Sequence, residues 1–385
     1  MNTISKFHID SIFIFIIGVA IFGFIVHESH TDIPVHIKQA LNIKNGEASY
    51  PPNFLFYLLV NIFSGISTSF KTLAITGIII LAIALSIKYY ATKSFLIQGK
   101  ATGNNQAIII SIMLIFCTCF QDPYNLLVLD QMYLGRAIPN VWHNSTSILL
   151  FPFTILLFWQ FLKTFSKDFV LTKSSILILL LLVILNAIIK PSFLFVFIPI
   201  LGLSFIYFIK NNKYIVALSF MFVGIISCLL ILSMHFLIFE EQVGSFQKTK
   251  SKVALSGPFQ VLRYWVPDWY LPISIASSYF FSIMTAIFYK TILKYKPFLL
   301  ALIMVVISLF ISGIFMETGP RKGHGNFTWQ NIFTSYILLL VTIKYLLKNH
   351  SLKEWKLKIL SAVFTLQFCF GIYYVLRLLF TKQYF

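Results

Sequence analysis

Long apolar runs dominate this chain and restrict what it can fold into. Eleven of them are about 17 residues or longer, close to the roughly 20 residues that an α-helix needs to cross a bilayer. Charged residues make up only 11% of the chain, against about 25% in soluble domains. Both a soluble globule and a disordered chain are therefore excluded. We expect an all-α polytopic membrane protein with about 11 transmembrane helices (10–12), at 9–26, 72–89, 105–121, 146–162, 174–190, 192–209, 214–238, 271–288, 297–315, 329–346 and 359–380.

The connections between these runs fall into two alternating classes. Four are long, aromatic and rich in Pro, Gly, His and Asn; these are the first to fourth outward loops, at 27–71, 121–145, 239–270 and 316–328. The others are short and carry lysines, namely Lys88, Lys93, Lys100, Lys163, Lys167, Lys173, Lys210, Lys213, Lys290, Lys294, Lys296 and those of 344–358. Because Lys and Arg stay on the cytoplasmic side, we predict a multi-pass protein of the cytoplasmic (inner) membrane. Its N-terminus is then cytoplasmic and its active site faces outward.

One apolar run, 54–66, is only thirteen residues long and follows Tyr50-Pro51-Pro52-Asn53. We expect a short interfacial helix that lies on or dips into the outer membrane face. The alternative, a true span, would reverse every later loop. No hydrophilic domain interrupts the chain, so 1–385 is expected to be a single transmembrane domain.

The net charge of +18 does not indicate a nucleic-acid partner, because the lysines lie between apolar runs, where they orient membrane helices. The arginines are more informative, since all four are expected on the outer side: Arg136, Arg263, Arg321 and Arg377. The planar guanidinium matches two phosphate oxygens at once. We predict that these arginines, with Lys190 between two apolar runs, bind a donor phosphate. The alternative is that they pair with the nine acidic residues of the outward loops.

Asp32 lies just beyond the first apolar run, where a carboxylate near the membrane surface can act as general base toward a hydroxyl. Its alternative role is a helix N-cap before Ile33-Pro34.

We predict sugar or acceptor binding by polar and aromatic side chains of three outward loops, namely His36, Trp142, His143, Asn144, Glu317 and His324. An interfacial aromatic belt would also explain Trp142. A metal site of His143 with His30, His36 or Asp32 is possible but not favoured, since no spacing indicates one.

The first loop resembles that of the GT-C superfamily of integral membrane glycosyltransferases, above all the protein mannosyltransferases and lipid A aminoarabinose transferases. The resemblance rests on Asp32, the following His36, and Tyr50-Pro51-Pro52 before a short apolar helix. It covers 1–200 by layout, the GT-C-like core, and leaves 201–385 as additional spans and loops. It implies an active-site acid at Asp32 and a donor sugar on a polyprenyl phosphate or diphosphate. The single Asp32, in place of an Asp-x-Asp pair, favours a mechanism without a metal or other cofactor.

The expected activity is thus transfer of a sugar from a polyprenyl-linked donor to a glycan or lipid-linked acceptor, in cell-surface polysaccharide biosynthesis. Membrane lipids are the other expected partners. Two alternatives stay open. An O-antigen or capsule repeat-unit polymerase would depend mainly on the later arginine loops. A lipid-linked sugar transporter or flippase is less favoured, because the apolar runs hold almost no charge in mid-span and show no internal repeat.

Overall fold

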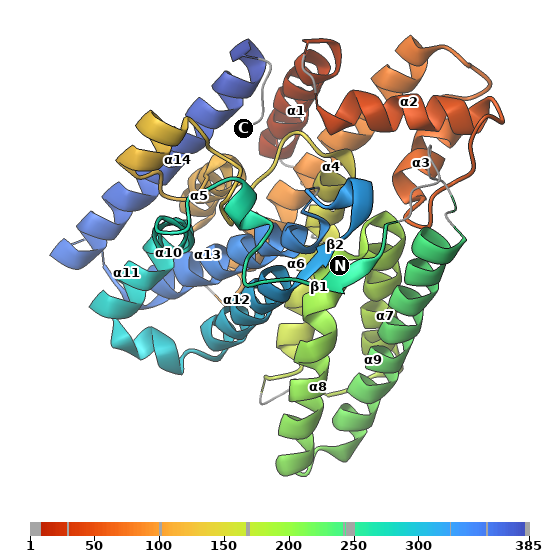
Figure 1. Ribbon diagram of the computed structural model, residues 1–385. Helices are drawn as coiled ribbons and strands as arrows, with labels where there is room; N and C mark the ends of the chain where they lie inside the picture. Colours follow the sequence, from red (N-terminus) through yellow and green to blue (C-terminus); the bar gives the residue numbers. More distant parts are fainter. Residues whose placement is uncertain are drawn as a thin grey trace.

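The computed structural model describes residues 9–28, 31–99, 102–166, 170–241, 243, 251–323, 325–351 and 353–381. These residues form fourteen α-helices and one two-stranded sheet (Figure 1). The predicted all-α polytopic class is confirmed. The helices are α1 (Ile9–Glu28), α2 (Asp32–Lys44), α3 (Leu55–Phe63), α4 (Phe70–Ile97), α5 (Asn104–Phe116), α6 (Ser145–Lys163), α7 (Lys173–Ile189), α8 (Leu194–Lys210), α9 (Tyr214–His235), α10 (Leu271–Ser278), α11 (Phe280–Phe288), α12 (Lys296–Ile314), α13 (Trp329–Asn349) and α14 (Trp355–Thr381).

Every predicted apolar run is wholly or partly helical, but the helices differ in length. Among the described residues, eight helices are long and apolar enough to cross a membrane: α1, α4, α6, α8, α9, α12, α13 and α14, some with a flanking turn. A ninth span results if α10 and α11, which meet at a bend of 69°, count as one. The apolar helices α5 and α7 are shorter, with 13 and 17 residues. Eight or nine spans therefore follow from length and composition, and eleven stays a prediction.

Helix α13 is the centre of the bundle, packed against α4, α6, α11 and α12. Every residue from Trp329 to Leu346 is buried. Because a buried polar side chain needs a partner, several polar residues of α13 bond to neighbouring helices. Asn331 donates to Ser312 Oγ at 3.2 Å, and the Tyr336 hydroxyl lies 2.6 Å from that of Thr92. These bonds fix the rotation of α13 and thus the position of Trp329 at its first turn.

Three lysines counted with the short connections lie inside helices and are buried. The side of the membrane on which they lie stays a prediction. Lys93 forms an ion pair with Asp10 at 2.6 Å. The Lys88 ammonium lies 3.5 Å from the centre of the Phe151 ring, and Lys344 donates to a backbone oxygen of α4 at 2.5 Å. The reason is the length of α4, whose 28 residues reach about 42 Å and carry its last lysines into contacts with other helices. The burial of these lysines is set by contacts with neighbouring helices, which the sequence does not show.

Helix α5 ends at Phe116, five residues before the predicted end of its span. The segment that follows is irregular apart from a π-helix at Asn125–Leu129, and its residues 137–144 are buried. Its polar groups find protein partners: Asn140 donates to the carbonyl oxygens of Leu114 and Cys117 at 2.9 and 2.5 Å. Gly371 of α14 packs against the Phe116 backbone so closely that a Cβ there would lie 1.7 Å from the carbonyl oxygen. Most of the second outward loop is therefore an internal segment.

The first outward loop contains α2 and α3. Figure 1 shows α2 running across the direction of α1. The run 54–66 forms a helix, but α3 has only nine residues and reaches about 14 Å, too short to cross a bilayer. The helical prediction for this run is confirmed. Its position at the outer membrane face stays a prediction.

The third and fourth outward loops are joined by the sheet. Strand β1 (Val253–Leu255) pairs antiparallel with β2 (Phe315–Glu317), so that Val253 lies opposite Glu317. Nothing in the sequence predicts this pairing. It fixes the backbone of the fourth loop where Glu317 enters the site.

Candidate functional site

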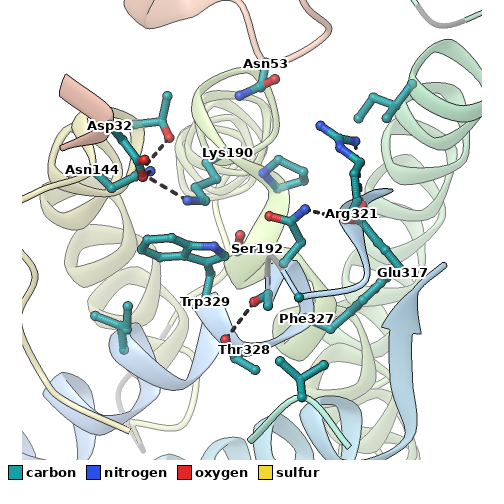
Figure 2. Close-up of a pocket in the computed structure, with 18 of the residues that line it drawn as sticks. Asp32, Asn53, Asn144, Lys190, Ser192, Glu317, Arg321, Phe327, Thr328 and Trp329 are labelled. Atoms are coloured by element: carbon teal, nitrogen blue, oxygen red, sulfur yellow. Dashed lines mark hydrogen bonds and ion pairs between the residues drawn. The ribbon is translucent and has the colours of Figure 1, made fainter. Parts of the chain in front are cut away.

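A large cavity of about 1050 Å³ lies where the outward loops meet (Figure 2). Residues of all four outward loops line it, together with the link at 190–192 between α7 and α8. Loops far apart in the sequence therefore share one cavity. This arrangement supports the prediction that these loops lie on the same side of the protein.

Asp32 is the first residue of α2, and its partly buried side chain lines the cavity. Its Oδ2 accepts a hydrogen bond of 2.8 Å from the Asn144 amide. The N-cap of α2 is Thr31, which makes no capping side-chain bond, so the alternative role of Asp32 as an N-cap is wrong. The positive end of the helix dipole favours a carboxylate at this place.

Asn144 holds the centre of a bonded chain between Asp32 and Lys190. It is the N-cap of α6, and its Oδ1 accepts from the Ser147 backbone N–H at 3.0 Å. The same oxygen accepts from Thr146 Oγ1 at 3.0 Å and from Lys190 Nζ at 3.2 Å. All three partners are donors, so the amide nitrogen must face Asp32.

Lys190 follows α7 and extends along the cavity wall (Figure 2). Its ammonium donates to Ser147 Oγ at 2.9 Å and lies 3.5 Å from the centre of the Trp329 ring. Burial lowers the pKa of this amine to about 7, although the Asp32 charge acts in the opposite direction. An amine with such a pKa can change its charge near neutral pH, which an ordinary lysine cannot.

Two histidines flank Asp32 and are neutral at pH 7. Burial lowers the pKa of both His36 and His143 to about 4, despite the Asp32 charge, which raises it. His36 Nδ1 contacts the Ser145 hydroxyl, and His143 Nδ1 lies 3.3 Å from the Tyr374 hydroxyl. The charges at this end of the cavity therefore come from Asp32 and Lys190.

The structure separates the four arginines. Arg377 and Arg263 do not line the cavity; they pair with Asp130 at 2.5 Å and with Asp268 at 3.4 Å. Arg136 lines it, but its guanidinium is directed into the protein. There it donates to the Phe120 carbonyl at 2.7 Å and to Asp122 and Tyr270. Burial acts to raise the pKa of Asp122, but the hydrogen bonds from Tyr270 and Arg136 hold it below its usual range. For these three arginines the structure favours pairing with loop acids over phosphate binding.

Arg321 is the arginine that remains available in the cavity wall. Its side chain is 38% exposed, and it lies 3.7 Å from the buried carboxylate of Glu317. Asn326 donates to the other oxygen of that carboxylate at 2.6 Å. Figure 2 shows Arg321 and Glu317 across the cavity from Asp32, Asn144 and Lys190.

The predicted sugar-binding residues are also divided by the structure. His36, His143, Asn144 and Glu317 line the cavity. Trp142 does not; it is buried and stacked on Phe116, with ring centres 5.2 Å apart, so its face cannot receive a sugar. His324 lies outside the described residues.

Sequence reasoning missed Trp329, Ser147 and Asn326. Trp329 begins an apolar run and was therefore counted with a span, although its ring contacts Lys190. Ser147, in the first turn of α6, likewise lies within a predicted span and is not expected in the site. Among the described residues, no group of three or more His, Cys, Asp or Glu side chains is placed to hold a metal ion.

Comparison with known proteins does not add to this geometry. No family model, no curated protein and no solved structure matches the chain. The chemistry of the site must therefore be argued from its residues.

Proposed function

We propose that this protein is an integral membrane glycosyltransferase. It would transfer a sugar from a polyprenyl-phosphate-type carrier to a glycan or lipid-linked acceptor in cell-surface polysaccharide biosynthesis. The observation that carries this proposal is the position of Asp32. Its carboxylate lines a cavity of about 1050 Å³ built by all four outward loops. One oxygen is held by Asn144, and the other accepts no hydrogen bond from the described residues, so it can accept the proton of an acceptor hydroxyl.

Of the basic residues that line the cavity, Lys190 and Arg321 have a complementary role. Transfer from a polyprenyl phosphate breaks the bond between the anomeric carbon and the phosphate oxygen, and the phosphate leaves with additional negative charge. Donors aimed at such developing charge are a large source of catalysis. Lys190 and Arg321 can supply them, Arg321 with two parallel N–H groups. The acceptor oxygen forms the new bond to the anomeric carbon while its proton passes to Asp32.

The membrane topology is part of the same proposal. Adding α5 and α7 to the eight long helices and the bent α10–α11 pair gives eleven spans. With the N-terminus in the cytoplasm, the loops that line the cavity then face outward. No metal is used, because the first loop supplies one aspartate at the site rather than a pair.

The test is transfer by the purified protein in proteoliposomes without any ion gradient. The donors are polyprenyl phosphates that each carry a different single sugar, and the acceptors are membrane glycans and lipid-linked glycans. The proposal expects release of polyprenyl phosphate and one new glycosidic bond per donor consumed. Movement of the donor between leaflets without bond formation would support a transporter instead. Products that grow by whole repeat units, with activity dependent on Arg321 but not on Asp32, would support the polymerase.

A further inference from the structure

Asn144 connects two charged groups that do not touch each other. Asp32 and Lys190 form no direct ion pair in the structure, whereas Asn144 donates to Asp32 at 2.8 Å and accepts from Lys190 at 3.2 Å. Figure 2 shows the amide between the carboxylate and the amine. The negative charge of the Asp32 carboxylate is thereby stabilised by the dipole of the Asn144 amide. The Lys190 ammonium does not contact the carboxylate.

The orientation of this amide follows from the α6 helix rather than from a ligand. Asn144 Oδ1 is occupied by the Ser147 backbone N–H, at 3.0 Å, because Asn144 is the N-cap of α6. Turning the amide would lose this cap and place the NH₂ group against donors. Both the loss of an N-cap and a buried donor without an acceptor destabilise the protein. The donation to Asp32 is therefore a consequence of the way in which α6 begins.

We propose that Asn144 is a positioning residue that keeps the Asp32 carboxylate turned toward the cavity and apart from Lys190. This inference rests on the proposed transfer reaction. A direct ion pair with Lys190 would occupy the carboxylate and weaken it as a base, whereas a neutral amide holds one oxygen and leaves the second for the acceptor. The same amide keeps the Lys190 ammonium from pairing with Asp32, so that its charge can act on the leaving phosphate.

Other titratable groups also surround Asp32, and none of them supplies this function. His36 of α2 and His143 before α6 are neutral above about pH 5, since burial lowers the pKa of each to about 4. Burial raises the pKa of Tyr57 of α3 above its ordinary value, so its hydroxyl stays protonated. Glu317 and Arg321 face the same cavity and form an ion pair with each other.

The test is Asn144→Asp. Aspartate caps a helix about as well as asparagine, so α6 keeps its start. The substitution replaces the amide donor by an oxygen that faces Asp32 Oδ2 at about the present 2.8 Å. Two carboxylates this close cannot both be ionised without a large penalty, even with Lys190 beside them. We expect the acid limb of kcat/KM to move upward by at least about one pH unit. We also expect an infrared band of a protonated carboxyl group at pH 7 that disappears in the double variant with Asp32→Asn.

The matched control is Thr172→Asp, which changes the N-cap of α7, away from the cavity. It should leave both the pH profile and the infrared spectrum unchanged. Asn144→Ser keeps a capping hydroxyl, but this shorter side chain has a single polar atom and cannot bridge Asp32 and Lys190 as the amide does. The variant should therefore lower kcat while the fold is retained. If Asn144→Asp does not fold, the serine variant is the test of the inference. A wild-type kcat in Asn144→Ser would then overturn it. A folded Asn144→Asp protein with the wild-type pH profile and no new band would overturn it too. If the wild type transfers no sugar but the band of the protonated carboxyl group appears in Asn144→Asp, the proposed function fails. The contact between Asp32 and residue 144 is then still supported.

Discussion

The pKa of Lys190 leads to a specific pH dependence. Burial lowers it to about 7 from the ordinary 10.5, and the leaving phosphate needs the protonated amine. At pH 8.5 only about 3% of a group with this pKa is protonated. Since kcat/KM reports ionisations of the free enzyme, it should fall about tenfold per pH unit above pH 7. Lys190→Arg removes this limb, because a guanidinium keeps its charge.

The assay is kcat/KM for sugar transfer between pH 6 and pH 9 in detergent micelles, for wild type and Lys190→Arg. Lys322→Arg is the control, because Lys322 is exposed on the fourth loop and should not change the profile. At pH 8.5 the ratio of kcat/KM for Lys190→Arg to that for the wild type should exceed its value at pH 6.5 by about 25-fold. A wild-type profile without a decline up to pH 8.5 would refute the reasoning. So would an equal decline in Lys190→Arg.

Three further outcomes follow from the structure. In the unfolded chain a histidine binds its proton below about pH 6.5, but His36 and His143 do so in the folded protein only below about 4. The free energy of unfolding should therefore decrease as pH falls from 6.5 to 4, by up to about 3 kcal/mol per histidine. In His36→Gln the decrease in Tm between pH 6.5 and pH 4 should be smaller than in the wild type. Gly371→Ala places a Cβ 1.7 Å from a backbone oxygen and should cost at least about 1–3 kcal/mol; Gly224→Ala, with open space around it, should not lower Tm. Arg321→Lys keeps the charge but loses the bidentate fork, so kcat/KM should fall several-fold, whereas unchanged kcat/KM would leave Arg321 only its ion pair with Glu317.

The general architecture could be predicted from the sequence for two reasons. The thickness of the bilayer sets a minimum length for each spanning helix, and the composition of the loops differs between the two sides of the membrane. The shared cavity follows from the same alternation, since loops expected on one side meet there. Asp32 could be singled out because it lies six positions beyond the end of the first apolar run. The number of spans could not be derived, because α5 ends early, where its chain continues as a buried segment that packs against Gly371.

Tertiary contacts account for the remaining differences. A lysine in an apolar run can snorkel to the membrane surface or bind inside the protein, and only the neighbouring helices decide; Lys88 and Lys93 bind inside. Trp142 and Trp329 have the same side chain beside polar residues, yet one stacks in the core and the other against Lys190. The capping bond of Asn144 could have been expected from its place before an apolar run, but its bond to Asp32 depends on how α2 meets α6.

The central claim, that Asp32 is the base of a sugar transfer, is tested most directly by Asp32→Asn. Asparagine keeps the shape of the side chain and can still accept the bond from Asn144, but it cannot take the acceptor proton. The account predicts a variant with wild-type Tm and unchanged binding of polyprenyl phosphate, whose kcat for transfer is lower by at least about a hundredfold. A folded Asp32→Asn protein that transfers sugar at close to the wild-type rate would contradict it.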